Sequence, residues 1–262
     1  MEGKTTNNRN LSWDRFWFSV RLEEYVSKVT CHDRLLVKSL ISWLEQVRIP
    51  PERQAKRILE IGCAYSKNLL MIPPLTGKDI IFLGLDSCKG PTSETGLNNP
   101  YSNVSVIVGD FFNSPINIKS LDMIISFGLI EHFRSPAKFL EVCYRMLYPG
   151  GRLVVGYPSY MGLTGQIQRA VNPQALKYHF SLPCKEMALQ ITSCGFSEVK
   201  TEYFGPFNPN MINWGHSRFK KLLMYSAFAA VRPLEWLVRI AGTTFASETF
   251  SSYVMATGIK PE

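Results

Sequence analysis

The feature that most constrains this chain is a series of short apolar runs, separated by loops at the spacing of strand–helix units. The seven runs are Arg57–Ile61, Ile80–Leu85, Val104–Val108, Leu121–Phe127, Arg152–Tyr157, Val199–Phe204 and Tyr253–Ile259. Each has the length of a strand, and helical patterns separate several of them. Alternating strands and helices predict an α/β fold, a seven-stranded and mainly parallel sheet with helices on both faces.

Helical patterns are clearest in three places. Residues Leu11 to Val47 repeat apolar side chains at three- and four-residue spacing, until Pro50 ends the pattern. A second helix has Ser135 as its N-cap and Pro136 at its first position, and we expect Pro149-Gly150-Gly151 to stop it. A third covers Lys185 to Thr192. The stretch from Lys89 to Pro100 is rich in Gly, Pro and Asn, so we expect a short helix or none there.

Two stretches exceed what the minimal strand–helix repeat needs, residues 158–183 and 205–252. We therefore expect residues 1–56 to form an N-terminal helical cap and residues 57–262 to form the main domain, with these stretches as insertions. The second insertion is predicted to be helical and to cap the domain between the sixth and seventh strands.

The composition is that of a globular protein, with 45% hydrophobic and 19% charged residues. Residues Met1 to Asn10 lack the apolar core of a signal peptide, so we expect a cytoplasmic protein. The net charge is +8, but the basic residues are interleaved with acids, which does not favour nucleic acid. The basic cluster of Arg218, Lys220 and Lys221 precedes an apolar stretch. It indicates either the solvated start of a helix, the commoner case, or contact of residues 218–241 with a membrane surface.

Candidate binding residues come directly after the predicted strands, where ligands bind in open α/β sheets. Gly62 lies in a tight turn after the first strand, where it allows a ligand to approach the backbone. Asp86 ends the second strand about 20 residues later, the position of an acid that accepts bonds from ribose hydroxyls. This acid fits NAD as well as S-adenosylmethionine, and it is otherwise an ordinary loop residue. Asp110 could accept a bond from an adenine amine while Phe111 covers the base; the alternative for Asp110 is a turn or helix cap.

Five segments in order resemble the motifs of class I methyltransferases of the type 11/12 group. They are Glu60-Ile61-Gly62-Cys63, Gly84-Leu85-Asp86-Ser87, Gly109-Asp110, Ser126 to Phe133, and Leu147 to Leu153. The resemblance spans roughly residues 57–204, and the loop Pro158 to Leu163 is similar to one in bacterial members with lipid, sugar or natural-product substrates. It implies a Rossmann-like fold and S-adenosylmethionine as cofactor, with S-adenosylhomocysteine as product.

The resemblance also implies roles for residues. Glu60 and the Gly62 turn would face the methionine part of the cofactor, Asp86 with Ser87 the ribose, and Asp110 with Phe111 the adenine, while Phe127 and Gly128 would line the cofactor. Ala64 and Ser66 stand where the family usually has glycines, so the turn must tolerate a Cβ atom or bind the cofactor differently.

His132 is the leading candidate for catalysis, because its unperturbed pKa lies near neutrality and an acceptor hydroxyl must lose its proton as the methyl group arrives. The alternative is a structural histidine bonded to the loop backbone. His179 is a second candidate. Similar ubiquinone-type enzymes hold a metal with Glu-x-x-Glu-His, but Gly128 stands in place of the first glutamate, and the six cysteines show no metal-site spacing. We therefore expect no metal.

The predicted activity is methyl transfer to a small acceptor, with oxygen as the favoured atom. The insertion carries many aromatic and apolar residues, which predict an apolar, lipid-like or sugar-containing acceptor under a cap, or alternatively an added core layer or a homodimer interface. An N-methyltransferase and a non-catalytic cofactor-binding scaffold remain as alternatives. A NAD-dependent dehydrogenase would need G-x-G-x-x-G, which the turn lacks.

Overall fold

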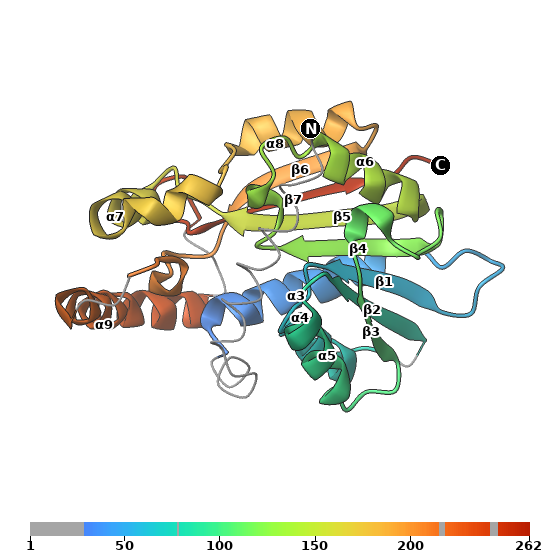
Figure 1. The fold of residues 1–262 in the computed structure, drawn as a ribbon, viewed down its shortest axis with the longest axis horizontal. Helices are drawn as coiled ribbons and strands as arrows, with labels where there is room; N and C mark the ends of the chain where they lie inside the picture. Colours follow the sequence, from blue (N-terminus) through green and yellow to red (C-terminus); the bar gives the residue numbers. More distant parts are fainter. Residues whose placement is uncertain (1–28, 78, 215–217, 242–245) are drawn as a thin grey trace. The chain divides into compact units, whose positions relative to one another are not determined.

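The computed structural model of the protein describes residues 29–77, 79–214, 218–241 and 246–262 (Figure 1). Seven strands join in one hydrogen-bonded sheet, in the order β3-β2-β1-β4-β5-β7-β6. Their bounds are β1 Lys56–Ile61, β2 Ile80–Asp86, β3 Val104–Val108, β4 Leu121–Phe127, β5 Leu147–Pro158, β6 Ser197–Phe204 and β7 Tyr253–Ile259. β1 pairs in parallel with β2 and β4, β2 pairs in parallel with β3, and β6 and β7 are antiparallel. The predicted mainly parallel α/β sheet is therefore confirmed.

Helices and short 3-10 turns alternate with these strands. The α-helices are α3 Cys31–Gln46, α4 Asn68–Met71, α5 Lys89–Leu97, α6 Ala137–Met146, α7 Leu163–Val171, α8 Cys184–Ser193 and α9 Arg218–Ala241. The 3-10 turns are η1 Pro73–Leu75, η2 Phe111–Asn113, η3 Ile130–His132, η4 Pro173–Tyr178 and η5 Pro209–Met211. Within the described residues, no helix has both the length and the apolar character that crossing a membrane requires.

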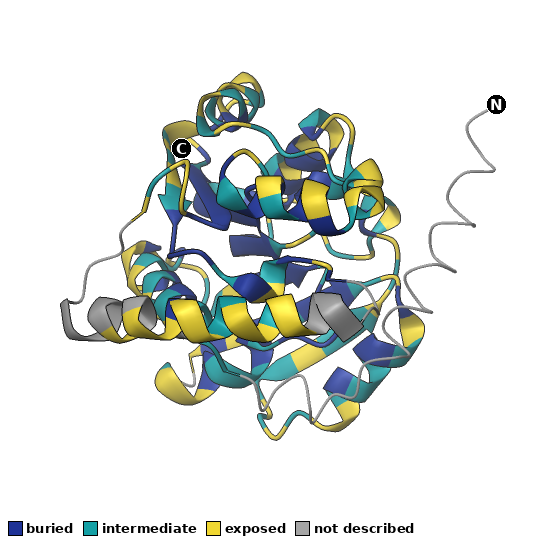
Figure 2. Cartoon of the chain, turned by 90° about the vertical axis from the view of Figure 1, so that its left-hand side faces the viewer, coloured by how far each residue is buried: buried dark blue, intermediate teal, exposed yellow. Residues whose placement is uncertain are grey.

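The chain folds as two compact units. Among the described residues, the first unit takes those up to Ser126, then Val142–Leu153 and Lys260–Glu262, and the second takes Phe127–Glu141 and Val154–Ile259. In the first unit, Thr30 and Asp33 form a capping box that starts α3. The apolar stripe of α3 then lies against the sheet, where Leu40 and Leu44 meet Ile58 of β1. Buried residues predominate in β1, β2 and β4, whereas those of β3 are intermediate or exposed; buried parts of the chain are dark blue in Figure 2.

In the second unit, α8 packs on β6 and β7, and a separate apolar cluster joins α7, the segment before α9, and α9 itself. The buried members of this cluster are Val171, Phe207, Ile212, Trp214 and Val231. The indole nitrogen of Trp214 donates to the Pro209 carbonyl at 2.9 Å, so the polar end of this buried side chain is satisfied. Part of the aromatic surface of the 205–252 insertion thus forms an added core layer.

One local expectation is wrong. Pro149-Gly150-Gly151 does not separate helix from strand, since α6 ends at Met146 and β5 begins at Leu147. The backbone of Gly150 donates to the Lys260 carbonyl at 2.8 Å, and Lys260 donates to Gly151 at 2.9 Å, so the C-terminal residues extend the strand. Between Lys89 and Pro100 the structure has α5, a helix of nine residues, in agreement with the expected short helix or none. The predicted helical pattern from Leu11 to Val47 is confirmed over α3, and its part before residue 29 lies outside the described residues.

Candidate active site

The turn after β1 is held in an unusual backbone conformation. Gly62 has a φ of 78°, and Ala64, a residue with a Cβ atom, has a φ of 27°. The Ala64 amide donates to Asp86 Oδ2 at 3.0 Å, and its carbonyl accepts from Thr95 Oγ1 at 2.7 Å. Hydrogen bonds from β2 and α5 therefore fix Ala64 in a region that L-residues rarely occupy. The turn does tolerate a Cβ where the resembling family usually has glycine.

Glu60 lies under this turn and is 5% exposed. Its carboxyl group accepts from Ser66 Oγ at 2.5 Å and from Asn68 Nδ2 at 2.8 Å. Burial raises the pKa of Glu60 to about 7, opposed by these two hydrogen bonds and assisted by the nearby charge of Asp86. Ser66 thus has a role that glycine could not fill, because its hydroxyl also accepts from the Leu69 amide at the start of α4.

Asp86 is half-buried at the end of β2, and Ser87 beside it is exposed. Asp86 Oδ1 accepts from the Cys88 amide at 2.8 Å, and Oδ2 accepts from Ala64. Burial raises the pKa of Asp86, and the backbone amides of Cys88 and Ala64 act in the opposite direction. Each carboxylate oxygen has a further lone pair, so this group can still accept from a ligand hydroxyl.

Asp110 follows β3 at the same edge, since the Gly109 amide donates to the Asp86 carbonyl at 2.9 Å. Its side chain accepts from the Phe112 amide at 3.0 Å and from Asn113 Nδ2 at 2.7 Å. The capping alternative for Asp110 is therefore realised, and the exposed carboxylate keeps lone pairs for a ligand. Phe111 is buried, 8% exposed, with its ring tilted against Phe112.

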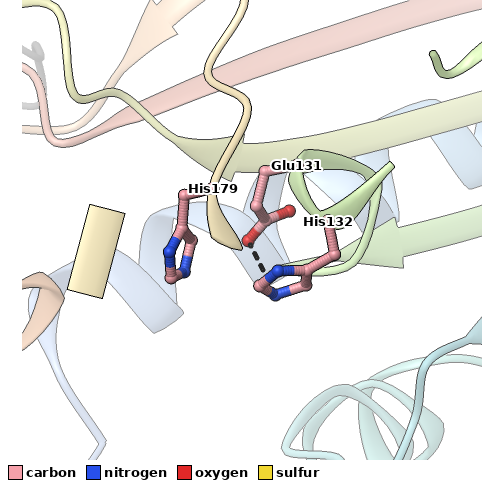
Figure 3. A group of neighbouring side chains, drawn as sticks. All are labelled: Glu131, His132 and His179. Carbon is pink, nitrogen blue, oxygen red and sulfur yellow. Dashed lines mark ion pairs between the residues drawn. The ribbon is translucent and has the colours of Figure 1, made fainter. Parts of the chain in front are cut away.

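The second unit holds the remaining predicted residues. Phe127 ends β4, and Gly128 is exposed with a φ of 70°, its amide bonded to the Gly156 carbonyl at 3.0 Å. Four residues later His132 lies beside His179, with ring centroids 4.8 Å apart (Figure 3). The two candidate catalytic histidines, 47 positions apart in the sequence, are thus neighbours.

Backbone carbonyls fix the tautomer of both rings. His132 Nδ1 lies 2.8 Å from the Tyr178 carbonyl oxygen, and His179 Nδ1 lies 2.6 Å from that of Ala175. A carbonyl oxygen only accepts, so Nδ1 carries the hydrogen in each ring, and in the neutral ring the lone pair is on Nε2. Burial lowers the pKa of His179, which favours the neutral form. The structural alternative for His132, a bond to the loop backbone, is also realised.

Glu131 completes this group, and the sequence analysis did not select it. Its side chain is 2% exposed, and Oε1 lies 3.9 Å from His132 Nε2 (Figure 3). Burial raises the pKa of Glu131 to about 8. The signal that could have identified it is an acid between apolar neighbours, Ile130 and Phe133, which predict that its carboxylate is buried.

Known proteins share sequence features and the fold with this chain. The family description Methyltransferase domain matches residues 59–155. A Mycobacterium tuberculosis (strain H37Rv) protein, named a probable S-adenosylmethionine-dependent methyltransferase, is 24% identical over 204 residues, 76% of this chain and 71% of the relative.

Two solved structures share the fold. An S-adenosylmethionine-dependent methyltransferase from Thermotoga maritima has a TM-score of 0.59 at 18% identity, covering 95% of this chain and 97% of the other. A Haemonchus contortus phosphoethanolamine N-methyltransferase in complex with S-adenosylmethionine has a TM-score of 0.58 at 14% identity, and the match covers 93% of this chain and only 60% of that longer one. Over residues 59–155 and in its fold, this chain is therefore similar to S-adenosylmethionine-dependent methyltransferases, whose cofactor is S-adenosylmethionine and whose product is S-adenosylhomocysteine.

Proposed function

We propose that the protein transfers the methyl group of S-adenosylmethionine to a hydroxyl oxygen of a small acceptor. The observation that carries this proposal is the pair His132 and His179, each with Nδ1 bonded to a carbonyl and its lone pair on Nε2. A hydroxyl is a weak nucleophile until its proton is taken, whereas an amine attacks with a lone pair of its own. A neutral imidazole is therefore the group that oxygen transfer needs, and His132 is the proposed base.

The cofactor is proposed to bind at the carboxyl ends of β1, β2 and β3. Glu60 and the Gly62–Ala64 turn would contact the methionine part, Asp86 and Ser87 the ribose, and Asp110 with Phe111 the adenine. Support comes from the hydrogen bonds that join this edge, from Ala64 to Asp86 and from Gly109 to Asp86. Phe127 and Gly128 are proposed to line the cofactor, where the bare backbone of Gly128 is exposed.

The acceptor is proposed to be apolar, such as a lipid-like or sugar-containing natural product. Exposed apolar side chains on α9 and on the loop after β5 support this proposal, among them Met161, Leu223, Tyr225 and Trp236. Burying such side chains against an apolar acceptor would be favourable by about 25 cal/mol per Å² of apolar surface. Contact with a membrane surface or a second copy through residues 218–241 would use the same exposed side chains of α9.

The test is to incubate the protein with S-adenosylmethionine labelled with ¹³C in its methyl group and an organic extract of the producing cells. We expect the label in O-methyl carbons, which NMR separates from N-methyl carbons. His132→Ala should lower the rate about a hundredfold or more, with S-adenosylhomocysteine affinity unchanged by calorimetry. Label on nitrogen would contradict the oxygen acceptor. Cofactor binding without transfer to any component would indicate the non-catalytic scaffold.

A further inference from the structure

We propose that Glu131, His132 and His179 form a binding site for one divalent transition-metal cation. Their ligating atoms, one from each side chain, all lie within 4.8 Å of one another (Figure 3). Two imidazole nitrogens and one carboxylate oxygen are a donor set suited to Zn²⁺, Co²⁺, Mn²⁺ or Fe²⁺, rather than to Ca²⁺ or Mg²⁺. Neither the glycine at position 128 nor the cysteine spacing, on which the expectation of no metal was based, bears on His179, the third ligand, which comes from a distant segment.

Glu131 gives the strongest reason to expect a cation. A carboxyl group that is 2% exposed needs partners for its oxygens, because burying a polar group without a hydrogen bond is costly, and burying its anion without a cation is more costly still. Within the part of the chain that the structure describes, Oε2 of Glu131 has no hydrogen-bond partner. A bound cation would satisfy this oxygen. The carboxylate also lies beside the two rings, so a cation held by it would be within reach of both.

The histidines already have the hydrogen bonds that metal-ligating histidines require. Such a histidine binds the metal with one ring nitrogen and donates from the other to a carbonyl or carboxylate, which fixes the tautomer and the ring orientation. His132 donates from Nδ1 to Tyr178, and His179 donates from Nδ1 to Ala175, so Nε2 of each ring is the ligating atom.

The two segments that supply the ligands are joined by their backbones. The Phe180 amide donates to the Glu131 carbonyl at 2.6 Å, next to the bond from His132 to Tyr178. The Tyr157 hydroxyl fixes the same loop by donating to the Leu182 carbonyl at 2.9 Å. These bonds place His179 beside Glu131 before any cation arrives. Ligands around tetrahedral Zn²⁺ lie about 3.3 Å apart at bonds of roughly 2 Å, so rotations of the side chains by about an ångström would close the site.

The site has room for a further ligand. A Cβ atom added at Gly128 would lie 3.8 Å from Glu131 Oε1, so glycine keeps side-chain atoms away from this side of the carboxylate. His132 and His179 are both partly exposed, which gives solvent access to the site. With three protein ligands, the cation retains an open position. Of the proposed function this step keeps only the oxygen acceptor, whose oxygen takes the open position; with Nε2 of His132 bound to the cation, water replaces the imidazole as the group that takes the proton. The cation would stabilise the negative charge that develops as the hydroxyl proton leaves to water, before oxygen attacks the methyl carbon and the carbon–sulfur bond breaks.

The experiment titrates the metal-free protein with Co²⁺ alone and follows its visible absorption, then repeats the titration with Zn²⁺ by calorimetry. We expect one equivalent of cation, bound at least tenfold more weakly by His132→Gln, His179→Gln and Glu131→Gln. The control is His32→Gln, which removes a histidine of α3 in the first unit and should bind as the unchanged protein does. Binding of S-adenosylhomocysteine shows that each variant is folded.

The proposal is overturned if the unchanged protein binds no equivalent of Co²⁺, or if the His132 and His179 variants bind it as tightly as the control. Should Glu131→Gln fail to fold, the two histidine variants decide the outcome. Labelled methyl transfer after EDTA treatment separates this proposal from the proposed function. If methyl transfer to oxygen persists without metal and still depends on His132, the His132 imidazole is the base and the cation has no part in the reaction.

Discussion

Ala64 shows how a single residue can depart from a family's pattern without losing the local structure. Its left-handed φ of 27° costs about 1 kcal/mol or more for a residue with a Cβ atom. The bonds to Asp86 and Thr95 hold it there, and its side chain is 2% exposed. The strain is stored at the turn proposed to receive the cofactor, where a fixed backbone is useful for binding.

The first prediction at this scale compares Ala64→Gly with Gly62→Ala. Glycine at 64 should relieve the strain but increase the freedom of the unfolded chain, for a net gain in stability of about 0.5–1 kcal/mol. Alanine at 62, where φ is 78°, should cost about 1–2 kcal/mol. Urea denaturation measures both. Equal effects of the two changes would mean that the left-handed conformation of Ala64 carries no strain.

At the scale of elements, α9 has two different faces. Met224, Ala227 and Val231 pack against the cluster that includes Trp214 and α7. Leu222, Tyr225 and Trp236 are each more than 60% exposed, and exposed positions recur along the helix (Figure 2). The packed face makes α9 part of an added core layer. Only the exposed face is therefore available to bind an acceptor, a membrane surface or a second copy of the chain.

Two tryptophans of the same insertion test this division. Trp214→Ala removes a buried side chain, 8% exposed, and should lower the free energy of unfolding by about 3–5 kcal/mol. Trp236→Ala removes one that is 62% exposed and should change it by less than about 0.5 kcal/mol. If α9 caps the acceptor, Trp236→Ala should instead raise the KM for the acceptor. An unaltered KM would remove the exposed face from the acceptor site.

At the scale of the whole molecule, buried carboxyl groups make stability depend on pH. Glu60 has a pKa of about 7 in the folded protein against 4.5 for the unperturbed group, so folding favours the protonated form. This contribution is complete below pH 4.5 and is lost as the pH rises through 7.

Glu60→Gln should remove that dependence, because a glutamine has no titrating proton and its amide oxygen can still accept from Asn68. The stability of the unchanged protein relative to Glu60→Gln should therefore fall between pH 5 and 7, by at most about 1.4 kcal/mol per pH unit. Denaturation curves at several pH values measure the difference, in which the other titrating groups cancel. A constant difference would show that Glu60 is ionised throughout this range.

Local sequence patterns determined the strands and the motif residues, because both depend on neighbours in the chain. The bounds of β3, β4 and β7 match the predicted runs, and α8 exceeds its predicted range by one residue at each end. Gly62, Asp86 and Asp110 could be selected from the sequence because ligands bind beyond the carboxyl ends of parallel strands, where these residues lie. Sequence also identified Ala64 as a departure, although not the hydrogen bonds that hold it.

Only the tertiary structure decided the features that depend on contacts between segments far apart in the sequence. Pairing with Lys260 extends β5 through Pro149-Gly150-Gly151, which local rules read as a stop. Packing decides which aromatic residues of the insertion are buried. No local sequence pattern separates Trp214, which is buried, from Trp236, which is exposed. The proximity of His179 to Glu131 depends on a backbone bond between loops 49 positions apart, from Phe180 to Glu131. No periodicity records such a contact, because it arises from the path of the folded chain and not from the residues adjacent to either partner.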